Sequence, residues 1–340
     1  MTDTFPIGII ANPASGKDVR RLIGSASVID NNEKVNVVRR ILGGLDALGI
    51  ERVCYMPEHF DIVGRAIDGL HLTIAATPLE MPYAGRPADT VRATSAMLDS
   101  KVRCIIVLGG DGTSRLVGSV CADTPIVAVS TGTNNALPSW IDGTVAGLAA
   151  GLIAHGEVDL DLCAPRSKRL EIVVEAPNIP VPINDIALVD LAISRERFVA
   201  ARAIWEPGHL ADLFLTRAEP GAIGLSAIGA HLEPLGREEP CGMWLQLGGS
   251  LLTVQAPIVP GIIRSVPIAS YRRIAIGEAI RFNPEPGVVA FDGEKEHEIP
   301  PNAHATVTVT MSGPRLVDIR RTIDVAARSG RFRGPAVIAS

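Results

Sequence analysis

The residues best suited to chemistry form a glycine-rich turn around a single carboxylate: Gly109, Gly110, Asp111, Gly112 and Thr113. The run before it, residues 103–108, is apolar without alternation, which is typical of a parallel strand covered on both faces. Glycines expose main-chain N–H groups to an anion and tolerate positive φ angles. Thr113 or Ser114 can cap a following helix, whose N-terminus favours an anion. The turn therefore predicts either a phosphate site or an ordinary strand-to-helix corner capped by Asp111.

A second candidate turn follows the apolar run of residues 6–11. Its hydroxyl, amide and ammonium groups can meet an anion, and they belong to Asn12, Ser15, Gly16 and Lys17. The stretch nearly matches a Walker P-loop, but Ala11 replaces the first Gly and Asp18 replaces the Mg²⁺-binding Ser or Thr. We therefore exclude a Walker loop. An anion site and a plain Asx/Pro turn remain as alternatives.

A third turn follows the apolar run of residues 125–130 and contains Thr133, Asn134 and Asn135. Its small and polar residues again suit an anion. Ligands of open α/β sheets bind at the carboxyl ends of the strands, so three such turns at three strand ends point to one place.

The elements that must position these turns alternate between strand and helix over the first half of the chain. Apolar residues at helical spacing predict helices over 35–48, 61–70 and 143–154. Short apolar runs between them predict strands, and the alternation indicates a right-handed parallel α/β sheet.

From residue 169 the pattern changes to short β-like runs separated by Pro and Gly turns, which indicates an antiparallel β-rich domain. The predicted strands include 170–175, 186–193, 244–247 and 251–256, and one helix is predicted over 207–217. We expect an α/β nucleotide-binding domain at 1–155, a β-rich substrate domain at 156–312, and a segment at 313–340 that packs back on the first domain.

Two acidic motifs lie in the second half. Asp292-Gly293-Glu294 follows an apolar run and is a strong hairpin-turn signal, because Asp-Gly suits a tight turn between two strands. Asn184-Asp185 precedes the run 186–193 and can equally be a turn that opens it. A role in a site and a role in a turn remain open for both motifs.

Composition excludes several classes of protein. The chain has 340 residues, a net charge of −5 and no basic stripe, which argues against nucleic-acid binding. No apolar run reaches the roughly 18 residues of a membrane span, and the N-terminus lacks the features of a signal peptide, so we expect a cytoplasmic protein without stable membrane association. The five cysteines are an odd number without a CxxC pair and predict neither a disulfide framework nor a zinc site.

Taken together and in this order, the motifs resemble the NAD kinase and diacylglycerol kinase-like superfamily, and within it the ATP-NAD kinase-like acetoin catabolism protein X family. The motifs are Asn12-Pro13-x-Ser15-Gly16, the turn 109–113, Gly132-Thr133-Asn134-Asn135, Asn184-Asp185 and Asp292-Gly293-Glu294. The resemblance covers nearly the whole chain. It implies a Rossmann-like parallel α/β domain followed by an antiparallel β-sandwich domain, with the active site in the cleft between them.

The same resemblance implies roles for individual residues. Gly109, Gly110, Gly112 and Thr113 would line the nucleotide phosphates, and Asp111 would activate the acceptor hydroxyl or help to hold Mg²⁺. Asn134 and Asn135 stand where relatives contact nucleotide, and Asn184-Asp185 resembles the Asn-Glu pair that NAD kinases use on the adenosine and ribose of NAD. Asp is shorter than Glu by one methylene, so the carboxylate of Asp185 is withdrawn relative to that of the NAD kinases. Asp292 and Glu294 belong to a motif that lipid-kinase relatives use in their site.

We therefore expect a Mg²⁺-dependent phosphotransferase that moves a phosphoryl group from ATP to a hydroxyl of NAD or a related small metabolite, with a possible link to acetoin catabolism. The alternatives are a catalytically inactive nucleotide-binding sensor and a kinase for a lipid or sugar-like alcohol. Relatives imply a homodimer or homotetramer.

Overall fold

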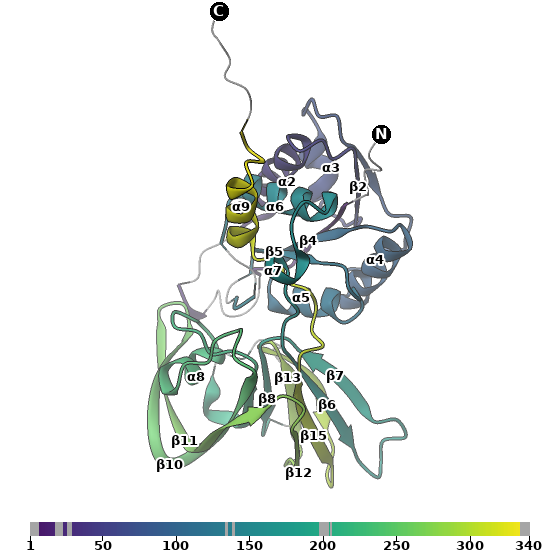
Figure 1. The fold of residues 1–340 in the computed structure, drawn as a ribbon. Helices are drawn as coiled ribbons and strands as arrows, with labels where there is room; N and C mark the ends of the chain where they lie inside the picture. Colours follow the sequence, from purple (N-terminus) through teal and green to yellow (C-terminus); the bar gives the residue numbers. More distant parts are fainter. Residues whose placement is uncertain are drawn as a thin grey trace, which may run out of the picture.

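A computed structural model of the chain describes residues 7–17, 23–25, 29–132, 135–137, 140–196, 204 and 206–333. Figure 1 shows two units, a parallel sheet with its helices and a pair of antiparallel sheets. This arrangement confirms the predicted fold class.

The parallel sheet has five strands in the order β3-β2-β1-β4-β5. They are β1 (Ile7–Ala11), β2 (Arg52–Tyr55), β3 (Ala75–Pro78), β4 (Cys104–Gly109) and β5 (Ile126–Ser130). The central strands β1 and β4 pair in parallel and are buried along their whole length, which explains their apolar runs without alternation. Because the strands are parallel, the three predicted turns leave the same edge of the sheet.

Helices cover both faces of this sheet. The helices α2 (Asn31–Asp46), α3 (Ile62–Ile67) and α6 (Gly143–His155) share a hydrophobic core with one face of β1. The helices α4 (Pro87–Asp99) and α5 (Asp111–Gly118) pack on the other face. The successive residues Ile9 and Ile10 of β1 contribute to the first and second core respectively, because neighbouring side chains of a strand point to opposite faces of the sheet.

The second unit consists of two antiparallel sheets. A six-stranded sheet has the order β11-β10-β9-β8-β13-β14, and a four-stranded sheet has the order β12-β15-β6-β7. The first sheet comprises β8 (Asp190–Ser194), β9 (Leu210–Leu215), β10 (Cys241–Val259), β11 (Ile262–Ala275), β13 (Gly287–Phe291) and β14 (Glu294–Ile299). The second comprises β6 (Arg169–Glu175), β7 (Ile183–Ala187), β12 (Ala279–Phe282) and β15 (His304–Thr310). Apolar side chains from both sheets, such as Ile172, Phe214 and Phe291, form the core of a sandwich.

The predicted helix over 207–217 is wrong. Residues Pro207–His209 form a short 3-10 turn, and Leu210–Leu215 form β9, which pairs with β8 on one side and β10 on the other. Leu213 and Leu215 enter the core beneath α8 (Ser226–Leu232), whereas Phe214 enters the sandwich core. Pairing on both edges overrides the local pattern, because strand formation depends on neighbours more than on intrinsic preference.

Two strand predictions also need correction. The run 186–193 is not one strand, since the chain passes from β7 in one sheet to β8 in the other at Leu188 and Val189. Conversely, the runs 244–247 and 251–256 belong to the single strand β10, whose register against β11 shifts between Leu247 and Leu252.

The last described helix, α9 (Ile319–Arg328), returns to the first unit, where it contacts α6 and the short helix α7 (Leu160–Cys163) (Figure 1). Leu316 forms a parallel bridge with Ile126 of β5 just before this helix begins. We propose that the units divide near residue 155 and that the segment after 312 belongs with the first unit. No helix in the described part of the chain has the length and apolar character needed to cross a membrane.

Candidate active site

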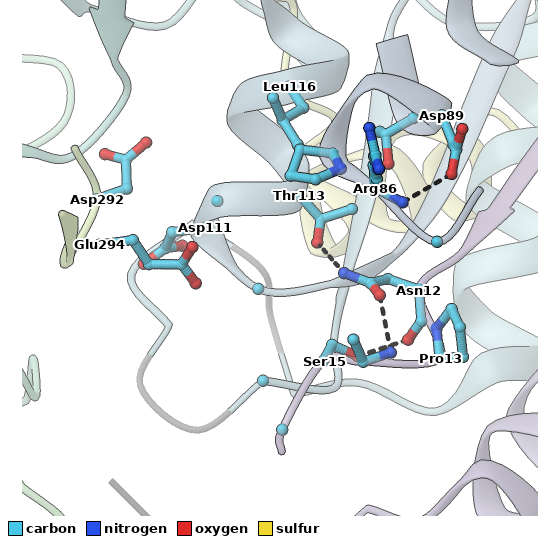
Figure 2. Close-up of a pocket in the computed structure, with 18 of the residues that line it drawn as sticks. Asn12, Pro13, Ser15, Arg86, Asp89, Asp111, Thr113, Leu116, Asp292 and Glu294 are labelled. Atoms are coloured by element: carbon cyan, nitrogen blue, oxygen red, sulfur yellow. Dashed lines mark hydrogen bonds between the residues drawn. The ribbon is translucent and has the colours of Figure 1, made fainter. Parts of the chain in front are cut away.

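A cleft of about 320 Å³ lies where the two units meet (Figure 2). The first unit contributes residues from the carboxyl ends of β1, β4 and β5, and the second contributes the β13–β14 hairpin. The sequence-predicted residues that line it are Asn12, Ser15, Gly16, Gly110, Asp111, Gly112, Thr113, Asn135, Asp292 and Glu294. The structure thus brings together residues from four of the five motifs.

Asn12 ties the first turn to the second. Its side-chain amide donates a hydrogen bond of 2.9 Å to the Thr113 hydroxyl, and its Oδ1 accepts one of 2.8 Å from the Ala14 N–H (Figure 2). Ser15 lies 2.8 Å from the Thr131 hydroxyl at the end of β5. The three turns therefore form one connected structure, and the polar side chains of the first turn mainly fix its geometry.

Lys34 supports the first turn from below and was not predicted as a site residue. Its ammonium is fully buried and donates hydrogen bonds to the main-chain oxygens of Asn12 at 2.9 Å and Ser15 at 3.0 Å. A sequence signal existed, because Lys34 shares one face of its helix with the apolar residues Val38 and Ile41. A cation on an apolar helix face must find acceptors when it is buried.

The glycines of the central turn serve close packing. A Cβ on Gly109 would lie 2.6 Å from the Thr113 Cβ, and a Cβ on Gly132 would lie 3.0 Å from the Gly110 Cα. None of the glycines at 109, 110 and 112 has a positive φ angle, so the turn does not use the conformational freedom that its composition suggested. Gly16 in the first turn does, with a φ of 73°, and its α-carbon faces the Thr131 carbonyl.

Asp111 is the first residue of α5 and is 8% exposed. Its carboxylate accepts hydrogen bonds of 2.9 Å from the N–H groups of Ala136 and Leu137, which follow the third turn. These bonds orient the carboxylate at the cleft wall.

Glu294 faces this wall from the second unit. Its carboxyl carbon lies 3.6 Å from the place that a Cβ on Gly112 would occupy, which is van der Waals contact distance, so Glu294 packs directly over the start of α5. Glu294 and Asp111 line the same cleft from opposite units (Figure 2). Glu296, two residues along β14, also lines the cleft. The cleft is therefore acidic where the two units approach each other.

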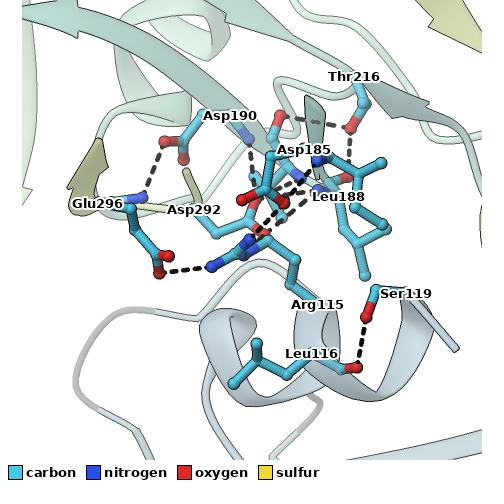
Figure 3. Close-up of polar contacts among 12 residues, drawn as sticks. Arg115, Leu116, Ser119, Asp185, Leu188, Asp190, Thr216, Asp292 and Glu296 are labelled. Atoms are coloured by element: carbon cyan, nitrogen blue, oxygen red, sulfur yellow. Dashed lines mark hydrogen bonds and ion pairs between the residues drawn. The ribbon is translucent and has the colours of Figure 1, made fainter. Parts of the chain in front are cut away.

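Asp292 forms the tight turn that its motif predicted. The φ angles of Asp292 and Gly293 are 50° and 77°, as in a type I′ hairpin turn. Its carboxylate accepts hydrogen bonds from the N–H groups of Leu188 at 3.1 Å and Val189 at 2.8 Å, where the chain changes sheets (Figure 3). Burial, together with the nearby charge of Asp190, raises its pKa well above the ordinary value. Asp292 thus holds the second unit together beside the cleft.

Arg115 links the two units, and the sequence did not predict a role for it. Its side chain is 4% exposed and pairs with Asp185 at 2.9 Å and with Glu296 at 2.5 Å (Figure 3). Its Nε lies 4.0 Å from Asp292. Burial opposes the charge, but the carboxylates of Glu296, Asp292 and Asp185 outweigh it and raise the pKa of Arg115.

Asp185 is occupied by these contacts. It accepts a hydrogen bond from Arg115, one from the Ile186 N–H, and lies 3.1 Å from His297 Nε2. Burial alone would raise its pKa, but the contacts with His297 and Arg115 lower it below the ordinary value. The carboxylates of Asp185 and Glu296 and the imidazole of His297 are close enough to one another to hold a metal ion, but the Arg115 guanidinium already supplies the cation there.

Several predicted residues do not line the cleft. Gly109 is the last residue of β4 and is not part of the lining, and Lys17 places its ammonium 4.6 Å from the centre of the Phe60 ring. Asn184 is exposed and donates to the Pro182 carbonyl at 3.3 Å. Thr133 and Asn134 lie outside the described residues.

Comparisons with known proteins agree with this architecture. Residues 7–158 match the model of the ATP-NAD kinase N-terminal domain, and residues 168–312 match that of the acetoin catabolism protein X C-terminal domain. The chain is 40% identical to acetoin catabolism protein X of Cupriavidus necator over 339 residues, which cover 96% of this chain and 94% of that protein.

The crystal structure of yeast NADH kinase complexed with NADH has a similar fold. The TM-score is 0.54 at 13% identity, and the superposition covers 99% of this chain and 91% of the yeast chain. At this identity the likeness concerns the fold alone. The chain therefore has the two-domain fold of the NAD kinases and belongs to the acetoin catabolism protein X family.

Proposed function

We propose that this protein is a kinase that transfers a phosphoryl group from ATP to a hydroxyl of NAD or a related small metabolite. The observation that carries the proposal is the position of Asp111, a fixed carboxylate at the first turn of α5, in a cleft between two units. The first N–H groups of a helix have no intrahelical partners, so the start of α5 suits phosphate oxygens, with the acceptor facing Asp111.

The donor set also suits Mg²⁺, which proteins usually bind through one or two carboxylates together with substrate phosphates. Asp111 and Glu294 are the carboxylates that would hold it, since both line the cleft and come from opposite units. Bound there, the ion would neutralise charge on the phosphate oxygens.

The chain's own residues would act mainly by positioning. The acceptor hydroxyl oxygen forms a bond to the terminal phosphorus, the bond from that phosphorus to the bridging oxygen breaks, and the hydroxyl proton passes to the Asp111 carboxylate. ADP and a phosphate monoester leave. The N–H groups of Ala136 and Leu137 keep the carboxylate oriented, because their hydrogen bonds fix it before the substrates bind.

The test is a comparison of Asp111→Asn with the parent protein. We expect the loss of turnover by a factor of about 100 to 10,000, the range typical of a general base, while folding is retained. Product formation is followed by mass spectrometry with ATP and a panel of NAD, NADH and diacylglycerol. Asp123→Asn is the matched control, because Asp123 is exposed and pairs with Arg166 away from the cleft. Near-parental turnover in the Asp111 variant would exclude the base or metal role.

A second candidate, a nucleotide-binding sensor without turnover, has one observation in its favour. The acid that would recognise the NAD ribose, Asp185, is occupied by Arg115 and His297, and neither Asn184 nor Asp185 lines the cleft. Calorimetric binding of ATP or NAD without product after long incubation would select this function. Turnover on diacylglycerol alone would select the lipid-kinase alternative.

We further propose that the protein works in the cytoplasm as a homodimer or homotetramer. A link to acetoin metabolism is also part of the proposal, and the name of the Cupriavidus necator relative supports it. Light scattering of the purified chain measures the oligomeric state.

A further inference from the structure

A second cavity of about 170 Å³ adjoins the cleft. It is lined by Asn135, Ala136, Arg217, Glu219 and Ser226, together with residues 220–222. One buried water needs roughly 10–15 Å³ of such space, so the cavity has room for a group of several atoms. Asn135 lines both spaces, so the cavity lies next to the cleft at that residue.

Arg217 is the unusual residue of this cavity. It is 6% exposed, and its Nε is buried without a hydrogen-bond partner. Among the described residues, none accepts a hydrogen bond or forms an ion pair within 4.0 Å with its guanidinium. A guanidinium has five N–H donors in a planar fork, and buried polar groups are normally satisfied. The exception calls for an acceptor that the described part of the chain does not provide.

The backbone holds Arg217 rigidly. On one side, the Thr216 hydroxyl donates to the Leu188 carbonyl at 2.7 Å, at the same sheet change that Asp292 stabilises (Figure 3). On the other side, Ala218 exchanges two main-chain hydrogen bonds with Leu235, of 2.8 and 2.9 Å. The guanidinium therefore extends from a preorganised strand end, as a binding residue should.

The surroundings of the cavity favour an anion of limited size. Ser226 lines it, and its hydroxyl makes no hydrogen bond to another described residue, so this hydroxyl can act as a second donor. Ser226 also lines a small space that reaches Asp111 and Asp292. Among the described residues that line the cavity, Glu219 is the acidic one, and its Oε1 accepts a hydrogen bond of 3.3 Å from the main-chain N–H of Arg237.

We propose that this cavity is a phosphate-binding subsite, in which Arg217 and Ser226 hold a phosphate group of the ligand bound in the cleft. A planar guanidinium binds two phosphate oxygens at once, which gives both affinity and orientation. The identity of the ligand that carries the phosphate rests on the proposed function. The existence of the subsite does not rest on the proposed function, because the binding of inorganic phosphate tests it without turnover.

The experiment measures the binding of inorganic phosphate, ATP and NAD to the full chain by calorimetry and by the rise in melting temperature. Arg217→Gln should weaken the binding of phosphate and of the ligand that carries it by about tenfold or more, the effect of losing a charge-assisted hydrogen bond. Arg217→Lys keeps the positive charge but loses the planar guanidinium, so it should weaken phosphate binding less than Arg217→Gln does. Glu219→Gln removes a negative charge that repels phosphate and should therefore strengthen the binding of phosphate.

Arg272→Gln is the matched control, because Arg272 is a half-exposed arginine of the same unit that pairs with Glu278 outside the cavity. Circular dichroism checks folding. If Arg217→Gln does not fold, the test rests on the other two variants, with weaker phosphate binding expected for Arg217→Lys and stronger phosphate binding for Glu219→Gln. Equal phosphate binding by the parent and Arg217→Gln would overturn the subsite. Weaker binding of free phosphate with unchanged binding of ATP and NAD would overturn its assignment to a ligand in the cleft. If no acceptor is ever phosphorylated but these affinities shift as expected, the proposed function fails and the subsite stands.

Discussion

Two buried arginines flank the same acidic cleft in opposite circumstances. Arg115 contacts the carboxylates of Asp185, Glu296 and Asp292, and these carboxylates raise its pKa. Arg217 has no such partner among the described residues, and burial lowers its pKa against the weaker pull of Glu219 and Asp111. The comparison shows two roles of a buried arginine. Arg115 joins the two units through ion pairs, whereas Arg217 has N–H donors that remain for a ligand.

The difference follows from the elements that carry the two residues. Arg115 lies on α5 one turn after Asp111, so it faces the acidic strand β14 across the interface between the units. Arg217 follows the end of β9, where the chain leaves the sheet beside a cavity. The charge of a structural cation is neutralised by carboxylates of the fold, as that of Arg115 is, while a buried cation without an ion pair is retained at a cost in stability, which is typical of functional sites.

The largest expected effect is on Arg115. Arg115→Met should lower the free energy of unfolding by about 3–5 kcal/mol, because it leaves buried carboxylates without their cation. Urea denaturation measures this change. Arg166→Met serves as a control, since Arg166 forms an exposed pair with Asp123 and its loss should change stability by no more than about 1 kcal/mol. Similar values for the two variants would remove Arg115 from its structural role.

A smaller effect is expected at Asp185. Asp185→Asn should cost about 2 kcal/mol at neutral pH, the value of a hydrogen bond to a charged group. The pKa of Asp185 is lower in the folded chain than in the unfolded chain, so its stabilisation is present above about pH 4 and is lost as the pH falls through the folded-state pKa. Unfolding at several pH values should therefore show the parent and the variant converging in acid. A constant difference at every pH would contradict the assignment.

The smallest change, of opposite sign, is expected at Arg217. Arg217→Met should raise the free energy of unfolding by about 1 kcal/mol, because it removes a buried charge without breaking a hydrogen bond. Urea denaturation without phosphate measures it, with Arg272→Met as the control. A loss of stability as large as that of Arg115→Met would show that Arg217 neutralises Asp111 and Asp292, and the contrast between the two arginines would disappear.

The sequence by itself determined the parallel α/β unit, the β-rich unit and the convergence of the turns. These features depend on local periodicity and on the rule that parallel strands end at one edge of the sheet. Asp111 and Glu294 could be predicted as cleft residues because their motifs follow or begin elements of recognisable type. The hairpin turn at Asp292 could be predicted as well, since Asp-Gly has a specific backbone preference.

Only the tertiary structure decided which strands pair and which side chains contact the two buried arginines. The strand β9 replaced a predicted helix because pairing on both edges overrides local preference. The contact of Arg115 with Asp185 spans 70 residues, and its contact with Glu296 spans 181, distances over which a sequence pattern carries no signal. The sequence equally cannot predict that Arg217 lacks a hydrogen-bond acceptor among the described residues. Whether a buried cation meets an acceptor depends on the positions of all neighbouring elements in the folded chain.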